Sequence, residues 1–312
     1  MKIYKYICLK DAIASITQGR LKLSNPKSFN DPFDTKVQRD PEDKKITKEI
    51  EIQSRKTMYV MECLNLPNVK EALKRSPLFK EAKREFFNYV EKIENDPFYS
   101  EPFSYDSLYK FLNLDKSHFE KRATEEALQL EERIRIETDK IVEGALVTCF
   151  SRKYESLLMW SHYADKHKGV CIEYDRPLSN DFIDMEYSDI RPKIKFESLT
   201  RYVSAVSIVG REYGQEIQRK VQLDCMLPFI TKSKEWEYEQ EVRCLITKNG
   251  QNLNLIKEGN DYFYKMPKPT KIYIGCRCRG NELTKLEKHA VKLGIKIKFL
   301  KDDKDTYSLV EK

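Results

Sequence analysis

Two glutamates and an arginine occupy alternate positions late in the chain, where a charged stretch becomes apolar. They are Glu239, Glu241 and Arg243, within residues 234–246. Side chains alternate between the two faces of a strand, so all three would share a face if a strand begins at Glu239. Carboxylates this close oppose each other's ionisation unless a cation or polar ligand lies between them, and Arg243 could be that cation. The segment predicts either an exposed acidic strand end with an arginine salt bridge or a carboxylate pair that acts on a ligand.

Residues 146–175 hold one of the two tryptophans and two of the four histidines of the chain. The apolar pattern predicts a strand at residues 146–150 and a short amphipathic helix at 155–164. A second strand is expected at 170–174, entered through Gly169. Functional side chains should concentrate where these three elements meet.

The helix of this unit carries both apolar and polar rings. Leu157, Leu158 and Trp160 have the helical spacing of core residues. His162 and Tyr163 instead place two hydrogen-bonding rings at the edge of the apolar run, where an aromatic body with a polar tip suits a ligand pocket. Both interpretations, core and pocket wall, remain open from the sequence.

A turn near the N-terminus interleaves aromatic and polar residues over residues 28–34. Asn30 and Asp31 can cap their own backbone, and Pro32 fixes its direction. The segment could be a plain turn anchored by its two phenylalanines. We expect instead that Asn30, Asp31 and Asp34 line one cleft together with Trp160, His162 and Tyr163.

The surrounding pattern predicts a single α+β domain of 312 residues with a mixed or antiparallel sheet of about six to eight strands. Residues 40–144 are rich in Lys, Glu, Arg and Leu with helical periodicity, and predict a helical insertion that contacts a partner rather than building the site. Helices are expected there at residues 70–93 and 115–142. Elsewhere we expect strands at 2–9, 20–23, 182–187, 271–275 and 295–300, and helices at 11–17, 199–226 and 282–293.

Composition excludes several classes of protein. A formal charge of +7 with 34% charged residues is weaker than that of a dedicated nucleic-acid binder. None of the ten glycines forms GxGxxG or GxxxxGK[ST], so a Rossmann dehydrogenase and a P-loop ATPase are not expected. The eight cysteines are scattered without a CxxC pair, which favours a reducing cytoplasm and no metal site. No apolar run suits a signal sequence or a membrane span, so we expect a cytoplasmic protein with no membrane contact.

Three motifs together resemble a known family. They are FNDPFD, the unit from CFS to GVCIEYD that contains MWSHYAD, and EYEQEVR. As a set they resemble the bacterial domain-of-unknown-function family 2971, over nearly the whole chain apart from the helical insertion. That family implies a fold without an established activity.

The order of the motifs is more distantly similar to that of ADP-ribosyltransferases, and this resemblance implies a chemistry with NAD as substrate. Glu241 would be the catalytic glutamate that grips the nicotinamide-side ribose, and Glu239 its partner. Thr148 and Ser151 would supply the hydroxyls of the second motif, and Tyr163 a stacking ring. No metal is required.

The same resemblance implies roles for the remaining candidate residues. Such enzymes usually place Arg or His on the opening strand, where this chain has Lys5 and Tyr6, and Lys is only a partial substitute for a bidentate Arg. Trp160 and His162 would join them around NAD, and Asn30, Asp31, Asp34 and Arg243 would contact the acceptor substrate. The acceptor would be a protein or nucleic acid, and the protein a toxin or phage-defence effector.

Two alternatives come from other classes. A metal-dependent nuclease or nucleic-acid-processing protein would use Glu173, Asp175, Glu239 and Glu241 to hold Mg²⁺, and would lose activity on chelation. A non-catalytic ligand-sensing or partner-binding module would use the aromatic pocket and the insertion, and would bind a ligand without turnover.

Overall fold

The chain forms two compact units. The computed structural model describes residues 1–36, 38–65, 77–193, 195–215, 217, 226–248 and 252–312. Residues 1–36, 140–191 and 229–312 form one unit, here called the sheet unit, and residues 37–139 and 192–228 form the other, the helical unit. The helical unit therefore contains most of the expected insertion of residues 40–144 and adds a second segment, 192–228.

An eight-stranded mixed sheet organises the sheet unit, as the sequence predicted. All neighbours are antiparallel except the parallel pair β11 and β12. In spatial order the strands are β13 (Leu309–Glu311), β12 (Lys296–Asp302), β11 (Lys271–Ile274), β4 (Val170–Asp175), β1 (Lys2–Ile7), β3 (Ala145–Ser151), β8 (Glu241–Thr247) and β5 (Phe182–Asp184). Two smaller sheets are formed by β2 (Arg20–Leu23), β10 (Asp261–Lys265) and β9 (Leu255–Glu258), and by β6 (Glu186–Ser188) with β7 (Thr231–Ser233).

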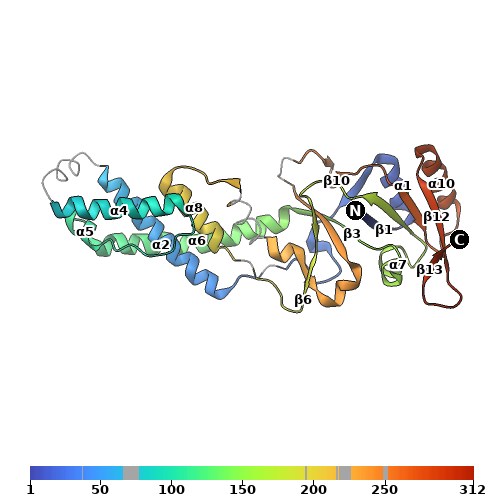
Figure 1. The fold of residues 1–312 in the computed structure, drawn as a ribbon, viewed down its shortest axis with the longest axis horizontal. Coiled ribbons are helices and arrows are strands. Elements are labelled where there is room, and N and C mark those ends of the chain that lie inside the picture. Colours follow the sequence, from blue (N-terminus) through green and yellow to red (C-terminus); the bar gives the residue numbers. More distant parts are fainter. Residues whose placement is uncertain (37, 66–76, 194, 216, 218–225, 249–251) are drawn as a thin grey trace. The chain divides into compact units, whose positions relative to one another are not determined.

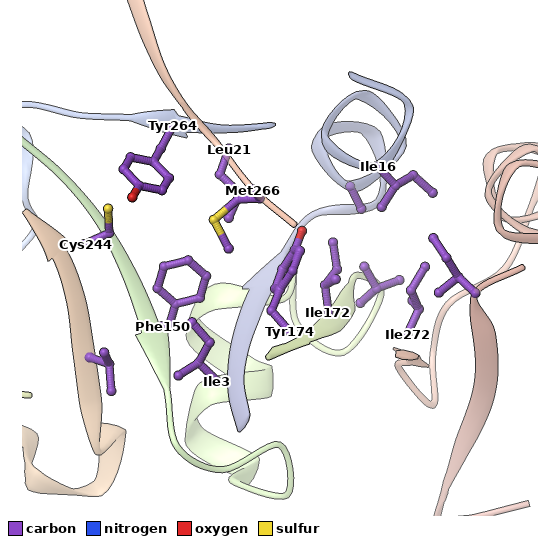
Figure 2. Close-up of a cluster of buried hydrophobic side chains, with 14 of the residues drawn as sticks. Ile3, Ile16, Leu21, Phe150, Ile172, Tyr174, Cys244, Tyr264, Met266 and Ile272 are labelled. Carbon is purple, nitrogen blue, oxygen red and sulfur yellow. The ribbon is translucent and has the colours of Figure 1, made fainter. Parts of the chain in front are cut away.

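One face of the large sheet builds the main apolar core. Side chains such as Ile3, Phe150 and Ile172 pack there with Ile16 of α1 (Leu9–Gln18) (Figure 2). Helix α10 (Asn281–Leu293) adds Leu286 to the same cluster. Figure 1 shows α1 and α10 on this side of the sheet. The expected end of the first helix is confirmed, because Gly19 follows α1 in the left-handed conformation at φ 64°.

The opposite face is covered by α7 (Leu157–Tyr163) and is richer in polar groups. Helix α7 begins at Ser156, whose hydroxyl accepts a hydrogen bond from the backbone N–H of Met159 at 3.4 Å. Trp160 is fully buried against Tyr6, with ring centroids 5.3 Å apart. This face therefore combines an aromatic core with the charged groups described below.

The helical unit has its own core. The helices described there include α2 (Pro41–Leu64), α4 (Pro77–Asn95), α5 (Asp106–Phe111), α6 (Lys116–Gly144) and α8 (Glu197–Val209); the last residues of α6 belong to the sheet unit. Helix α2 begins where the Asp40 side chain accepts from the N–H of Glu42 at 3.0 Å, with Pro41 in the first turn. A separate apolar cluster includes Phe86, Leu108 and Ile208. Among the described helices, none is both long and apolar enough to cross a membrane.

Several boundaries differ from the sequence prediction. The helix expected at residues 199–226 ends at Val209, because Gly210 adopts φ 71°. Residues 216 and 218–225 of that prediction, and residues 70–76 of another, lie outside the described residues. The strand expected at 182–187 is two strands, β5 and β6, which belong to different sheets. Residues 234–239 form the 3-10 helix η2 (Lys234–Glu239), so β8 begins at Glu241 and not at Glu239.

The entry to β4 leaves no room for a side chain. A Cβ at Gly169 would lie 2.3 Å from the Ile7 carbonyl oxygen and 2.9 Å from that of Ala164. We expect Gly169→Ala to lower the free energy of unfolding by about 2 kcal/mol or more, since the backbone of the central strands would have to shift. Gly144→Ala is the matched control, because no atom lies within 4 Å of its added Cβ. Equal urea midpoints for the two variants would contradict this account.

The separate cores predict that the sheet unit folds alone. Replacing residues 37–139 and 192–228 by short Gly-Ser linkers should leave a soluble protein with one cooperative urea transition, since both of its apolar clusters come from residues of the sheet unit. Circular dichroism and hydrogen exchange would measure this. An insoluble product, or one that unfolds without a cooperative transition, would show that the helical unit is needed for the core.

Candidate functional site

A fully buried guanidinium lies at the centre of the site. Arg243, on β8, donates from Nη1 to Asp34 Oδ1 at 2.9 Å and to the Phe229 carbonyl at 3.0 Å, while Nη2 contacts the other Asp34 oxygen. Its Nε donates to Glu241 Oε1 at 2.7 Å. The Phe29 ring lies 5.4 Å from the guanidinium carbon. Bidentate pairing with a carboxylate suits the planar fork of arginine and compensates its buried charge.

A second cation, Lys232 on β7, completes the cluster. Its ammonium donates to Glu239 Oε2 at 2.6 Å and to Glu241 Oε2 at 3.2 Å. It also lies 4.0 Å from Asp34 Oδ2 and 4.7 Å from the centre of the Trp236 ring. Sequence reasoning missed Lys232, and the only signal was its position two residues after the apolar pair Phe229 and Ile230. We call Asp34, Lys232, Glu239, Glu241 and Arg243 the ion cluster.

The environment shifts the pKa values of the two glutamates in opposite directions. Burial would raise the pKa of Glu241, but Arg243 and Lys232 outweigh it and lower the pKa to about 2. Burial dominates at Glu239 and raises its pKa, although Lys232 and Tyr163 act in the other direction. Glu241 is thus held as a carboxylate, whereas Glu239 takes up a proton more readily than an ordinary glutamate. A pair of this kind is a common source of acid and base roles.

Partly exposed aromatic rings border the ion cluster. The Tyr163 hydroxyl, from α7, donates to Glu239 Oε1 at 2.6 Å, and Tyr187 accepts from the Glu241 backbone N–H at 2.7 Å. Trp236 and Tyr238 of η2 are half-buried, with ring centroids 6.1 Å apart. These rings give the buried charges an aromatic border at the surface of the unit.

Glu239 and Glu241 lie close together although they belong to different elements, η2 and β8. Gln240 adopts φ 43°, a left-handed conformation that ends η2 and turns the chain into β8. The Ser151 hydroxyl donates to the Glu239 carbonyl at 2.7 Å and fixes this turn. Of the two interpretations of this segment, the exposed strand end was wrong: Glu241 is only 4% exposed, and its carboxylate packs against Arg243 and Lys232.

Of the predicted site residues, the structure brings six together. Glu239, Glu241, Arg243, Asp34, Tyr163 and Ser151 all contact the ion cluster or belong to it. Asp31 lies in the same turn as Asp34, where its side chain accepts from the Phe33 N–H at 2.8 Å as a local cap. Asn30 is exposed in that turn.

Lys5 and Thr148 lie on the other face of the sheet. Tyr4 is paired with Ser151, so Lys5 falls on the side of Ile3, and Thr148, which is paired with Cys244, shares that side. The Lys5 ammonium donates to the Thr148 hydroxyl at 3.0 Å and to the Cys149 carbonyl at 2.9 Å, and its burial lowers its pKa. The structure does not join these two residues to the carboxylates.

The other aromatic candidates, Tyr6, Trp160 and His162, contact residues outside the ion cluster. The Trp160 indole N–H donates to the Tyr154 carbonyl at 2.6 Å, and the Tyr6 hydroxyl donates to the Lys153 carbonyl at 2.9 Å. Trp160 is therefore a core residue, the plainer of its two interpretations. His162 is exposed beside the Tyr163 ring. Of the three aromatic residues expected in one cleft, only Tyr163 contacts the ion cluster.

The four acidic residues of the nuclease alternative do not converge. Glu173, on β4, accepts from the Thr270 hydroxyl at 2.6 Å and from the Tyr273 hydroxyl at 3.1 Å. It lies three strands from β8, about 14 Å at the usual strand spacing. Asp175 is exposed and pairs with Lys2 at 2.9 Å. In the described part of the chain, no group of three or more His, Cys, Asp or Glu side chains is placed to hold a metal ion.

Comparison with known proteins gives one match. The family model described as "Protein of unknown function (DUF2971)" matches residues 159–244. This span runs from α7 to β8 and includes Tyr163, Lys232, Glu239 and Glu241, but not Asp34. The match supports the resemblance to family 2971 over these residues. No curated protein and no solved structure matches the chain, so the more distant resemblance to ADP-ribosyltransferases has no support from these comparisons.

Glu241→Gln should destabilise the protein in a pH-dependent way. The pKa of Glu241 falls from an ordinary 4.5 to about 2 on folding, so its contribution is present above about pH 4.5 and is lost as the pH falls toward 2. We expect the variant to lose about 3 kcal/mol of unfolding free energy at pH 7, because two buried cations lose an anion. The deficit should shrink at pH 3, as urea titrations at both pH values would measure. Glu237→Gln, an exposed neighbour in η2, should change stability little, and a deficit independent of pH would contradict the ion-cluster account.

Proposed function

We propose that the protein is an enzyme that cleaves the bond between nicotinamide and ribose in NAD and transfers ADP-ribose to a protein or nucleic acid. The observation that supports this function is the pair Glu239 and Glu241, adjacent carboxylates whose pKa values are shifted in opposite directions. Glycosyl transfer uses a carboxylate pair of this kind, one member as a fixed anion and the other as a proton carrier.

The proposed roles follow from the charges that develop in the reaction. Nicotinamide leaves with the electron pair of the glycosidic bond, and the ribose carbon gains oxocarbenium-like positive charge. Glu241, held ionised by Arg243, would stabilise that charge in a water-poor site. Glu239 would take the proton that the acceptor hydroxyl, amine or ring nitrogen loses as it bonds to the same carbon.

Lys232 suggests how the substrate would enter. Both oxygens of Glu241 are already engaged, Oε1 by Arg243 and Oε2 by Lys232. The Lys232 ammonium lies between two carboxylates and over the Trp236 ring, which is an environment suited to a cation. The nicotinamide ring of NAD is a planar cation, so we propose that it displaces the Lys232 side chain from this position.

The test is release of nicotinamide from NAD by the purified protein in the presence of cell extract. Glu239→Gln keeps the shape of the side chain and an oxygen for Lys232, but it cannot take a proton. We expect it to reduce the release rate about a hundredfold or more, the usual contribution of a general base. Glu237→Gln, which is exposed in the same 3-10 helix, is the matched control and should leave the rate unchanged. A chelator should have no effect on either protein.

Two controls separate chemistry from folding. Melting temperatures of Glu239→Gln and wild type must be compared in the same buffer, because Glu239 is buried. Tyr163→Phe removes the hydroxyl that contacts Glu239 and should lower the rate less than Glu239→Gln does. A folded Glu239→Gln protein that releases nicotinamide at the wild-type rate would exclude the proposed mechanism.

A further inference from the structure

The helical unit contains a cavity of about 300 Å³ that is separate from the ion cluster in its residues. It is lined by side chains of α2, α4 and α8 and by the connection that carries Pro97 and Pro102. The two prolines interrupt the helical pattern there, so the connection does not continue α4. A volume of this size is at the lower end for small-molecule sites and suits a ligand as large as a nucleobase or nucleoside.

Two residues that line the cavity each carry a buried polar atom without a hydrogen-bond partner in the part of the chain that the structure describes. The side-chain oxygens Gln53 Oε1 and Ser204 Oγ are buried and make no hydrogen bond within the described residues. Ser204 is only 7% exposed. An unpaired buried polar atom costs roughly 1–3 kcal/mol, and native structures contain few of them. A ligand that donates to the Gln53 oxygen and bonds the Ser204 hydroxyl would remove that cost.

The rest of the wall favours an aromatic ligand. Tyr89 and Tyr99 line the cavity with ring centroids 6.0 Å apart at 63°, and Ile50 and Ile208 add apolar surface. Flat aromatic rings bind well between tyrosine faces and aliphatic side chains. The cavity therefore combines apolar walls with a small number of hydrogen-bonding groups.

The charges of the cavity disfavour an anion. Its arginine, Arg201, donates to Glu197 at 3.0 Å and to the Tyr99 carbonyl at 3.4 Å, so its charge is already compensated. Glu49 and Glu101 also line the cavity. A phosphate group would thus meet two carboxylates and a paired arginine, which is unfavourable.

We propose that this cavity binds an uncharged, amino-substituted nitrogen heterocycle of nucleobase or nucleoside size. The exocyclic amine would donate to Gln53 Oε1, the neighbouring ring nitrogen would accept from the Ser204 hydroxyl, and the ring would contact Tyr89 and Tyr99. This site does not depend on the function proposed for the ion cluster.

Binding can be measured on the full-length protein by saturation-transfer NMR and calorimetry with named probes. Adenosine and cytidine both carry an amine beside a ring nitrogen and should bind. Purine riboside lacks the amine, and AMP adds a phosphate; both should bind at least about tenfold more weakly than adenosine. Gln53→Leu and Ser204→Ala should each weaken adenosine binding by about the same factor. Ser207→Ala, on the exposed side of α8, is the control and should bind like wild type.

The same variants give a second readout without ligand. Each removes an unpaired buried polar group, so both should melt at or above the wild-type temperature while binding adenosine more weakly. Absence of binding by adenosine and cytidine at millimolar concentration would overturn the proposal. An adenosine affinity that is unchanged in both variants would also overturn it. A melting temperature that falls in both variants would overturn it as well, because the two polar atoms would then already have hydrogen-bond partners such as water.

Discussion

The burial of the Arg243 guanidinium sets the conditions that the rest of the sheet unit must satisfy. A charge removed from water is tolerated only when it is paired and hydrogen-bonded, and Arg243 has no exposed surface. Its partners are Asp34, which is 209 residues away in the N-terminal turn, the Phe229 carbonyl, and the nearby Glu241 on the same strand. Asp34 and Glu241 are the two carboxylates that contact it, and Lys232 supplies the second cation, which pairs with Glu241 and with the third carboxylate, Glu239. The turn, β7, η2 and β8 are in this way tied to one another by charge.

The same arrangement makes the two glutamates chemically unequal. Glu241 contacts both cations, whereas Glu239 contacts Lys232 and the neutral hydroxyl of Tyr163. One carboxylate is therefore fixed as an anion and its neighbour has a raised pKa, although they are separated by a single residue. The left-handed Gln240 between them produces this difference, since it takes Glu239 off the strand and places it beside the aromatic border. A regular strand would have put both glutamates in similar surroundings.

The sequence predicted an element or a site residue correctly wherever a local pattern alone determined its structure. Strands β3 and β4 are buried on both faces and appeared as apolar runs, and Gly19 ended α1 as a left-handed cap. The carboxylates and Arg243 were found because charges are rare in an apolar strand. Lys232 could not be found in this way, since its role depends on partners seven and nine residues away across a turn. The sequence also could not show on which face of the sheet Lys5 lies. That face is set by the pairing of Tyr4 with Ser151, and the register of two strands so far apart in the chain cannot be predicted from a local pattern.

The position of β1 in the sheet also affects how the protein forms during synthesis. Both neighbours of β1, β3 and β4, lie between residues 145 and 175, so Lys2–Ile7 has no strand to pair with until that part of the chain has been made. At ribosomal speeds of about 5–20 residues per second, this delay is roughly 10–30 s. Throughout it the nascent chain carries a strand with both edges open, and open edges pair readily with other chains. The strand order therefore leaves this short segment open to pairing with other chains until its partners emerge.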